Sequence, residues 1–323
     1  MSQLTHLAQD NIKRLTSVTE RLIASSEKRP MSTLSDHPWD VVVTEPPYLR
    51  KKERISIYGT EYWDKASEEE IRRLSVEETI TWWSAFVHLE SLVVEYYMRE
   101  LNDGAFKDLP LVRDYMTHFV KEELVHTLVF KKAIRYYEKD IYPMPEFLRS
   151  FYDDNAGTGK YPLMAVYLTM VIEWIADQYQ RLDVDADYVH PMAKTVVHEH
   201  WKEEMRHIKW GQSMIQSLIH TDDEFKRHAQ ELTPVYVRQL IDQGVTNVEC
   251  FEKVGFADPA FQDTERLLDT VIYSKHRKNL NSELIRPLLH YFITSGVYDE
   301  AYCDIWEMQG FADDLNHLLK KVS

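Results

Sequence analysis

Apolar residues recur three or four positions apart through most of the chain, which is the spacing of one face of an α-helix. The expected helices cover residues 2–28, 67–101, 110–139, 161–182 and 188–219. Ser67, followed by three glutamates, resembles a capping box at the start of the first long helix. No segment shows the sustained alternation of apolar and polar residues that predicts a strand.

Two regions flank the four long helices. Residues 29–64 contain four of the twelve prolines and predict an extended segment. Residues 220–323 predict three or four further helices, with breaks near Gly244, Gly255–Pro259 and Ser295–Gly296. We therefore expect an all-α protein with a single domain over residues 1–323. Its expected parts are a four-helix core at about 67–219, an N-terminal arm at 1–66 and a C-terminal helical region at 220–323.

Composition and charge narrow the function classes. Only 9 of 323 residues are glycine, which argues against a β-sandwich or barrel with its frequent turns. The net charge of −15 disfavours binding to nucleic acid or to an anionic membrane surface. The longest apolar stretch, Leu163–Ile172, is about half a membrane span. With no apolar segment near residue 1 and only two cysteines, we expect a soluble cytoplasmic protein.

Charged residues interrupt the apolar faces of the four long helices in a regular order. The first helix carries Glu90 within an apolar stripe, and the third carries Glu173 as the lone charge between Leu163 and Ala176. The second and fourth helices each carry a Glu-x-x-His unit. These units are Glu123/His126 and Glu204/His207.

This spacing has a chemical reason. Residues three apart lie about 60° apart on a helix, so the Glu and the His of one unit both face the bundle axis. A Glu from each of two helices, with Glu-x-x-His from each of the other two, is the di-iron pattern of ferritin-like bundles. A lone carboxylate on an apolar face, as at Glu173, is costly unless it is paired or metal-bound. The order therefore predicts a ferritin-like bundle with a two-metal site.

Several choices around this site stay open from the residues alone. Glu95 competes with Glu90 as the first ligand, although Glu90 continues the apolar stripe. Glu122 has the wrong spacing for His126, so Glu123 is preferred. His200 lies on the same narrow face as Glu204 and His207, either as a third imidazole ligand or as a packing histidine. His88 and His198 are expected to be surface or packing residues, and Asp177 and Arg206 are expected to orient ligands.

Two motifs resemble known proteins. The run Glu203–His207 resembles the acidic-Glu-x-Arg-His motif of di-iron oxygenases, desaturases and ribonucleotide reductase small subunits. Together with His200, it is similar to the p-aminobenzoate N-oxygenase family, which comprises di-iron arylamine oxygenases with a third histidine ligand. The segment Tyr58–Asp64 also resembles the part of that family that precedes the first bundle helix. The resemblance covers about residues 55–220.

The resemblance implies two iron ions per chain, O₂ as oxidant and an amine substrate oxidised at nitrogen. It implies that the iron ligands are Glu90, Glu123, His126, Glu173, His200, Glu204 and His207. The sequence has no Gly-x-Gly-x-x-Gly fingerprint and no cysteine cluster, so we expect an external electron donor or reductase. We also expect a homodimer. The main alternative is a di-iron hydroxylase or desaturase acting on C–H bonds. Iron storage, a ribonucleotide reductase small subunit and a metal-free scaffold are further alternatives.

Overall fold

The protein is all-α, as its hydrophobic pattern predicts. The computed structural model describes residues 9–31, 37–43, 45–104, 106–146, 148–149, 162–218, 223–245 and 247–322. Within these residues there are eleven α-helices, and the β contact there is one isolated bridge between Tyr48 and Val189. None of the described helices is long and apolar enough to cross a membrane.

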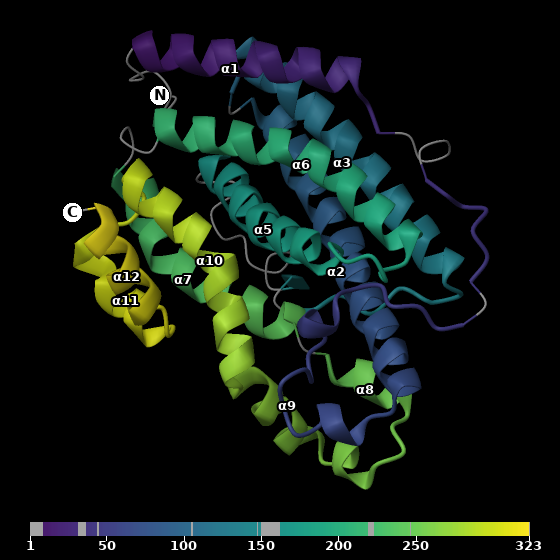
Figure 1. The fold of residues 1–323 in the computed structure, drawn as a ribbon. Helices are drawn as coiled ribbons and strands as arrows, with labels where there is room; N and C mark the ends of the chain where they lie inside the picture. Colours follow the sequence, from purple (N-terminus) through teal and green to yellow (C-terminus); the bar gives the residue numbers. More distant parts are fainter. Residues whose placement is uncertain are drawn as a thin grey trace.

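Four long helices form the centre of the molecule (Figure 1). They are α2 (Glu68–Asp103), α3 (Pro110–Tyr136), α5 (Pro162–Asp183) and α6 (Pro191–Leu218). Their observed ends lie within three residues of the expected ones. Helix α1 (Gln9–Lys28) lies across α3 and α6, and residues 2–8 of the expected first helix lie outside the described part.

Local chemistry sets the ends of these helices. The Ser67 side chain accepts a bond from the Glu70 backbone, and the Glu70 carboxylate accepts one from the Ser67 backbone, which completes the predicted capping box. Helix α2 ends at Gly104, whose φ of 72° is left-handed and favours glycine. Helices α3, α5 and α6 each begin at a proline, which has no backbone N–H to leave unpaired in the first turn.

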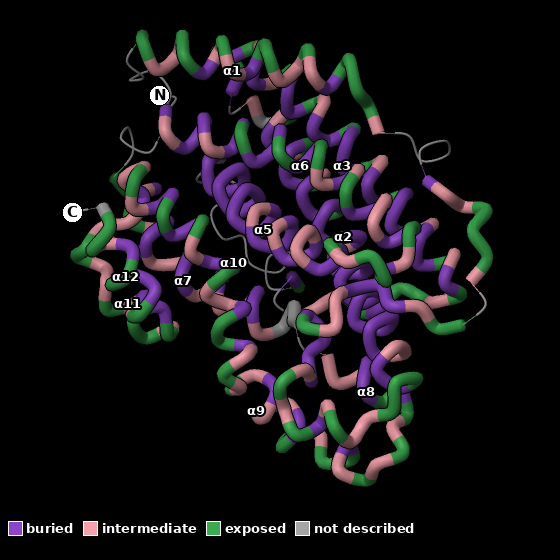
Figure 2. The backbone as a smooth tube through the Cα atoms, in the orientation of Figure 1, coloured by how far each residue is buried: buried purple, intermediate pink, exposed green. Residues whose placement is uncertain are grey.

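Helix α5 is the most deeply buried part of the bundle (Figure 2). Almost every described side chain from Leu163 to Ile175 is buried, because helices pack around α5 on several sides. Helix α6 approaches it closely at Gly211, where a Cβ atom would lie 2.7 Å from the Cβ of Met170. Glycine is therefore required at this contact between α5 and α6.

The C-terminal region holds more helices than the pattern predicted. Its described residues form six α-helices instead of three or four: α7 (Asp223–Val245), α8 (Val248–Val254), α9 (Thr264–Tyr273), α10 (Lys275–Ser295), α11 (Cys303–Met308) and α12 (Ala312–Val322). The predicted breaks at 255–259 and 295–296 are confirmed, with Gly255 and Gly296 in left-handed conformations. Helix α7 runs through Gly244 and ends one residue later. Helices α7 and α10 pack against α5, and α8 packs against α2.

A buried ion cluster fastens the extended segment before α2 to the bundle. The Arg50 guanidinium lies 3.0 Å from Glu78 of α2 and 3.2 Å from Asp183 at the end of α5. All three side chains are at most 5 % exposed. Burial raises the pKa of Asp183 to about 6 even though Arg50 and Arg54 lower it, so the cluster is strongly desolvated.

Replacing Arg50 is expected to destabilise the fold strongly. Arg50→Met leaves two buried carboxylates without their main counterion, and the free energy of unfolding should fall by about 3–5 kcal/mol. Lys52→Met is the matched control, because Lys52 pairs with Glu68 at the surface and should contribute less than about 1 kcal/mol. Urea denaturation of the metal-free proteins measures both changes, and equal effects would contradict this account of the cluster.

Candidate metal centre

All seven predicted ligands lie in the interior of the four-helix bundle. Helix α2 supplies one, α3 two, α5 one and α6 three. Each is at most 3 % exposed: Glu90, Glu123, His126, Glu173, His200, Glu204 and His207.

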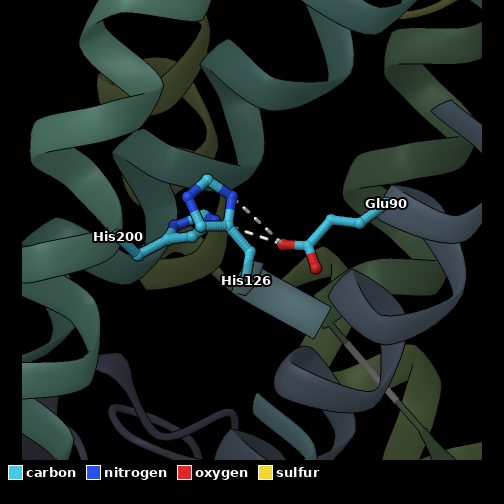
Figure 3. Close-up of side chains that lie close together, drawn as sticks. All are labelled: Glu90, His126 and His200. Atoms are coloured by element: carbon cyan, nitrogen blue, oxygen red, sulfur yellow. Dashed lines mark hydrogen bonds and ion pairs between the residues drawn. The ribbon is translucent and has the colours of Figure 1, made fainter. Parts of the chain in front are cut away.

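The seven side chains fall into two adjacent groups, each of which could hold one metal ion. Glu90, His126 and His200 form the first group. In Figure 3 both rings lie beside the carboxylate, with His200 Nε2 at 3.2 Å and His126 Nδ1 at 3.9 Å from Glu90 Oε1. The second group is formed by Glu123, Glu173, Glu204 and His207. Within each group one donor atom from every residue lies within 4.8 Å of the others.

Glu204 lies between the two groups. Its Oε1 is 3.1 Å from both His126 Nδ1 and His200 Nε2, whereas its Oε2 is 3.3 Å from His207 Nδ1. Each oxygen therefore faces a different group, which is the arrangement of a carboxylate that bridges two metal ions.

Glu123 is placed in the same way. Its Oε1 lies 2.9 Å from His207 Nδ1, and its Oε2 lies 3.9 Å from His126 Nδ1. The glutamates of the two Glu-x-x-His units thus share one position between the groups, with Glu90 and Glu173 at the two ends.

Glu173 lacks the partners that a buried carboxylate needs. Both oxygens of Glu173 are buried without a hydrogen-bond partner among the described residues. A buried carboxylate in that state is costly unless a cation binds it. Mixed carboxylate and imidazole donors suit iron or manganese. The four carboxylates would balance the charge of two divalent ions, so the residues present fit a pair of ferrous ions.

Without metal, protons have to supply this positive charge. Burial lowers the pKa values of His126 and His207, but the surrounding carboxylates raise both well above the usual range. The same competition raises the pKa of His200 to about 9. Burial raises the pKa of Glu90 to about 7 and, with the charges of Glu204 and Glu123, raises that of Glu173. The metal-free centre therefore holds several protons at neutral pH.

Iron binding is expected to expel these protons. Because two divalent ions replace the positive charge of four protons, the protein should release about four protons as it takes up two ferrous ions near pH 7. The apparent iron affinity should therefore fall steeply between pH 8 and pH 6. Anaerobic calorimetry in buffers of different ionisation enthalpy measures the proton release. Binding without proton release would show that the centre is not the metal site.

Glu122, Glu203 and Arg206 form an outer ring of side chains that holds His126 and His207 in place. His126 Nε2 donates to Glu203 at 2.9 Å, and His207 Nε2 donates to Glu122 at 2.8 Å. Each outer glutamate therefore supports the histidine of the other Glu-x-x-His helix. Arg206 donates to both glutamates, at 2.9 Å and 2.8 Å. Burial raises the pKa of Glu122, but the hydrogen bond from His207 outweighs burial and lowers this pKa to about 2. These bonds turn Nδ1 of both histidines toward the centre.

Only part of this ring was predicted from the sequence. Arg206 was expected to orient ligands, and it does so through Glu122 and Glu203 rather than by direct contact. Asp177, the other residue expected to orient a ligand, makes no hydrogen bond with the described residues. The missed signal was the doubled Glu-Glu-x-x-His, which places an extra glutamate before each unit.

Two polar contacts hold His200 and Glu90 of the first group in position, and neither contact was predicted from the sequence. The Gln180 amide lies 2.7 Å from His200 Nδ1 and leaves Nε2 facing the centre. Thr127 donates to Glu90 Oε2 at 3.1 Å. Aromatic rings cover the histidines: Phe86 packs edge-on against His200, and Phe119 stacks on His207 with ring centroids 3.6 Å apart. The rings exclude water from the centre.

The other glutamate and the other two histidines considered from the sequence lie away from the metal centre. Glu95 is on the surface, 48 % exposed and paired with Arg99, so the choice between Glu90 and Glu95 favours Glu90. His198 is exposed on α6. His88 bonds to the Tyr142 backbone carbonyl, away from the centre. These positions agree with the expectation that neither histidine binds metal.

One comparison with known proteins bears on this centre. A family model described as p-aminobenzoate N-oxygenase AurF matches residues 13–296. The match includes all four central helices and extends beyond the 55–220 over which the motifs carried the resemblance. No curated protein matches the chain.

Proposed function

The chain belongs to the AurF family of p-aminobenzoate N-oxygenases, and we propose that it is a non-haem di-iron oxygenase that oxidises the nitrogen of an arylamine or another amine with O₂. The observation that carries this proposal is the pair of adjacent groups, with two histidines in the first and one in the second. The third histidine, His200, is the feature shared with this family by resemblance.

In the proposed centre, Glu90, His126 and His200 would hold one iron, and Glu173 and His207 would hold the other. Glu123 and Glu204 would be shared by both ions, because each points one oxygen toward each group. The donor atoms are His126 Nδ1, His207 Nδ1 and His200 Nε2, since the opposite nitrogen of each ring is already bonded.

When bound, the two irons would supply the electrons that reduce O₂ and the oxidising power that reaches the amine nitrogen. The protein's own residues prepare the site for this chemistry. The outer ring of Glu122, Glu203 and Arg206 fixes the histidines, and Phe86 and Phe119 exclude water. We propose that a separate reductase returns electrons to the irons between turnovers.

Product analysis tests the proposed reaction. Iron-loaded protein is reduced anaerobically with a chemical donor, mixed with a panel of neutral arylamines and exposed to ¹⁸O₂. We expect hydroxylamine, nitroso or nitro products that carry the label on nitrogen. Metal-free protein serves as the control and should give no product. Label found on ring or alkyl carbon, or desaturated product, would instead support the C–H hydroxylase or desaturase alternative.

A further inference from the structure

Trp210 of α6 lies beside the metal centre in a buried group of aromatic side chains. It follows His207, a proposed ligand, by three residues, so both side chains lie on the same side of α6. The ring of Phe119 on α3 stacks on His207 with centroids 3.6 Å apart, and the same ring lies edge-on to Trp210 at 5.9 Å. A continuous path of ring contacts therefore joins the second group of ligands to the Trp210 indole.

Two tyrosines complete the packing around this indole. Tyr97 of α2 lies 6.0 Å from Trp210, and Tyr115 of α3 lies 5.2 Å from it, measured between ring centroids. None of the four rings is more than 1 % exposed, so water is excluded from the indole. The π-electrons of the three surrounding rings can stabilise a positive charge at this position.

The hydrogen bonding of this group favours the loss of an electron from the tryptophan. Trp210 Nε1 is buried and bonds to none of the described residues, so no base there accepts its proton. The Tyr115 hydroxyl is unpartnered among these residues in the same way. Burial raises the pKa values of Tyr97 and Tyr115, so both phenols hold their protons firmly. Because a tyrosine is oxidised easily only when its proton also leaves, whereas an indole can lose an electron alone, Trp210 is the better electron source.

Resting on the proposed oxygenase function, we propose that Trp210 gives one electron to the iron centre when O₂ reacts there with no amine bound. O₂ at the irons is the oxidant. The indole loses one electron through Phe119 and His207 and becomes a radical cation, while no bond forms or breaks and Nε1 keeps its proton. The reductant that recharges the irons later returns an electron to the indole. Trp210 thus spares the iron ligands from oxidation when O₂ is consumed without substrate.

Two tryptophans beside the first group are less closely connected to it. Two phenylalanine rings, edge-on to the His200 ring at 5.0 Å and 4.9 Å, separate it from Trp82 and Trp83. The second steps, from these phenylalanines to the two indoles, are 6.3 Å and 6.2 Å. Each step is longer than the corresponding step through Phe119. Since electron transfer weakens steeply with distance, we expect Trp210 to be oxidised in preference to both.

Electron paramagnetic resonance of freeze-quenched samples tests this step. The iron-loaded full chain is reduced anaerobically, freed of excess reductant, mixed with O₂ without amine and frozen at successive times. We expect an organic-radical signal that is lost in Trp210→Phe and weakened when an arylamine is present, because the amine then takes the oxidising equivalents. Trp306→Phe is the matched control. Trp306 is also buried with an unpartnered Nε1, but it lies on α11, and its loss should leave the signal unchanged.

Isotope labelling gives a second readout in the unaltered protein. Ring-deuterated tryptophan should narrow the radical signal, whereas ring-deuterated tyrosine should not. A signal that deuterated tryptophan leaves unchanged, or one that persists in Trp210→Phe, would overturn the inference. So would the absence of any organic radical in protein that consumes O₂ and oxidises amines, and these three results would leave the proposed function standing. Iron-loaded protein that does not react with O₂ would refute the proposed function and this inference with it.

Discussion

Glu204→Ala and Glu123→Ala are each expected to lower iron content from about two ions per chain to well below one, because each glutamate faces both metal positions. Loss of either removes one of the four carboxylates that balance two divalent ions. Turnover should fall by more than ~100-fold, beyond the usual loss for a residue that only supports a ligand. Colorimetric iron assay after anaerobic loading measures the first effect, and single-turnover product yield measures the second.

Two controls separate loss of a ligand from loss of the fold. Glu204→Gln keeps the shape of the side chain, and the metal-free variant should show helical circular dichroism like that of the parent. Glu95→Ala removes a surface carboxylate from α2 and should leave iron content unchanged. If Glu204→Ala kept two ions per chain, the bridging role would be refuted.

His200→Ala is expected to depress turnover by more than ~100-fold while leaving the fold and part of the metal in place. Six of the seven proposed ligands remain, so some iron should still bind. The change should be confined to one of the two irons, since His200 belongs to the group with Glu90 and His126. Mössbauer spectroscopy of the iron-57 protein should show one altered site and one nearly unaltered site.

His198→Ala is the matched control for this prediction. His198 lies two residues earlier on α6 and is exposed, so its loss should change neither the spectrum nor turnover. Gln180→Ala tests the support of His200 and should cost ~10–100-fold in activity or metal affinity. A His200→Ala protein with the parent's spectrum and activity would show that His200 is a packing residue.

The four central helices could be predicted because they follow from local spacing, which placed them within three residues of their ends. The Glu-x-x-His interval put the Glu and the His of each unit on one helix face, but it did not give the grouping. His126 lies with Glu90 and His200, whereas Glu123 lies with Glu173, Glu204 and His207. The preference for Glu90 over Glu95 followed from the apolar stripe on α2. Burial separates the two residues in the structure, where Glu90 is 2 % exposed.

The outer ring could not be predicted in the same way. His207 bonds to Glu122, 85 residues earlier, and His126 bonds to Glu203, 77 residues later. Such pairings depend on how α3 and α6 face each other, which local spacing does not specify. Asp177 illustrates the opposite error, because it is close to Glu173 in sequence yet bonds to none of the described ligands. The C-terminal helices were undercounted because α8, α9 and α11 are too short to show clear periodicity.

The most direct test of the di-iron centre is an anomalous difference map, recorded at the iron absorption edge, from crystals of the iron-loaded protein. Two peaks per chain are expected, one in each group, with Glu123 and Glu204 between them. His126 Nδ1, His200 Nε2 and His207 Nδ1 are expected at ~2.0–2.2 Å from iron, by analogy with zinc–imidazole bonds. A single peak, peaks outside these groups, or His200 beyond ~3 Å from either iron would contradict this arrangement.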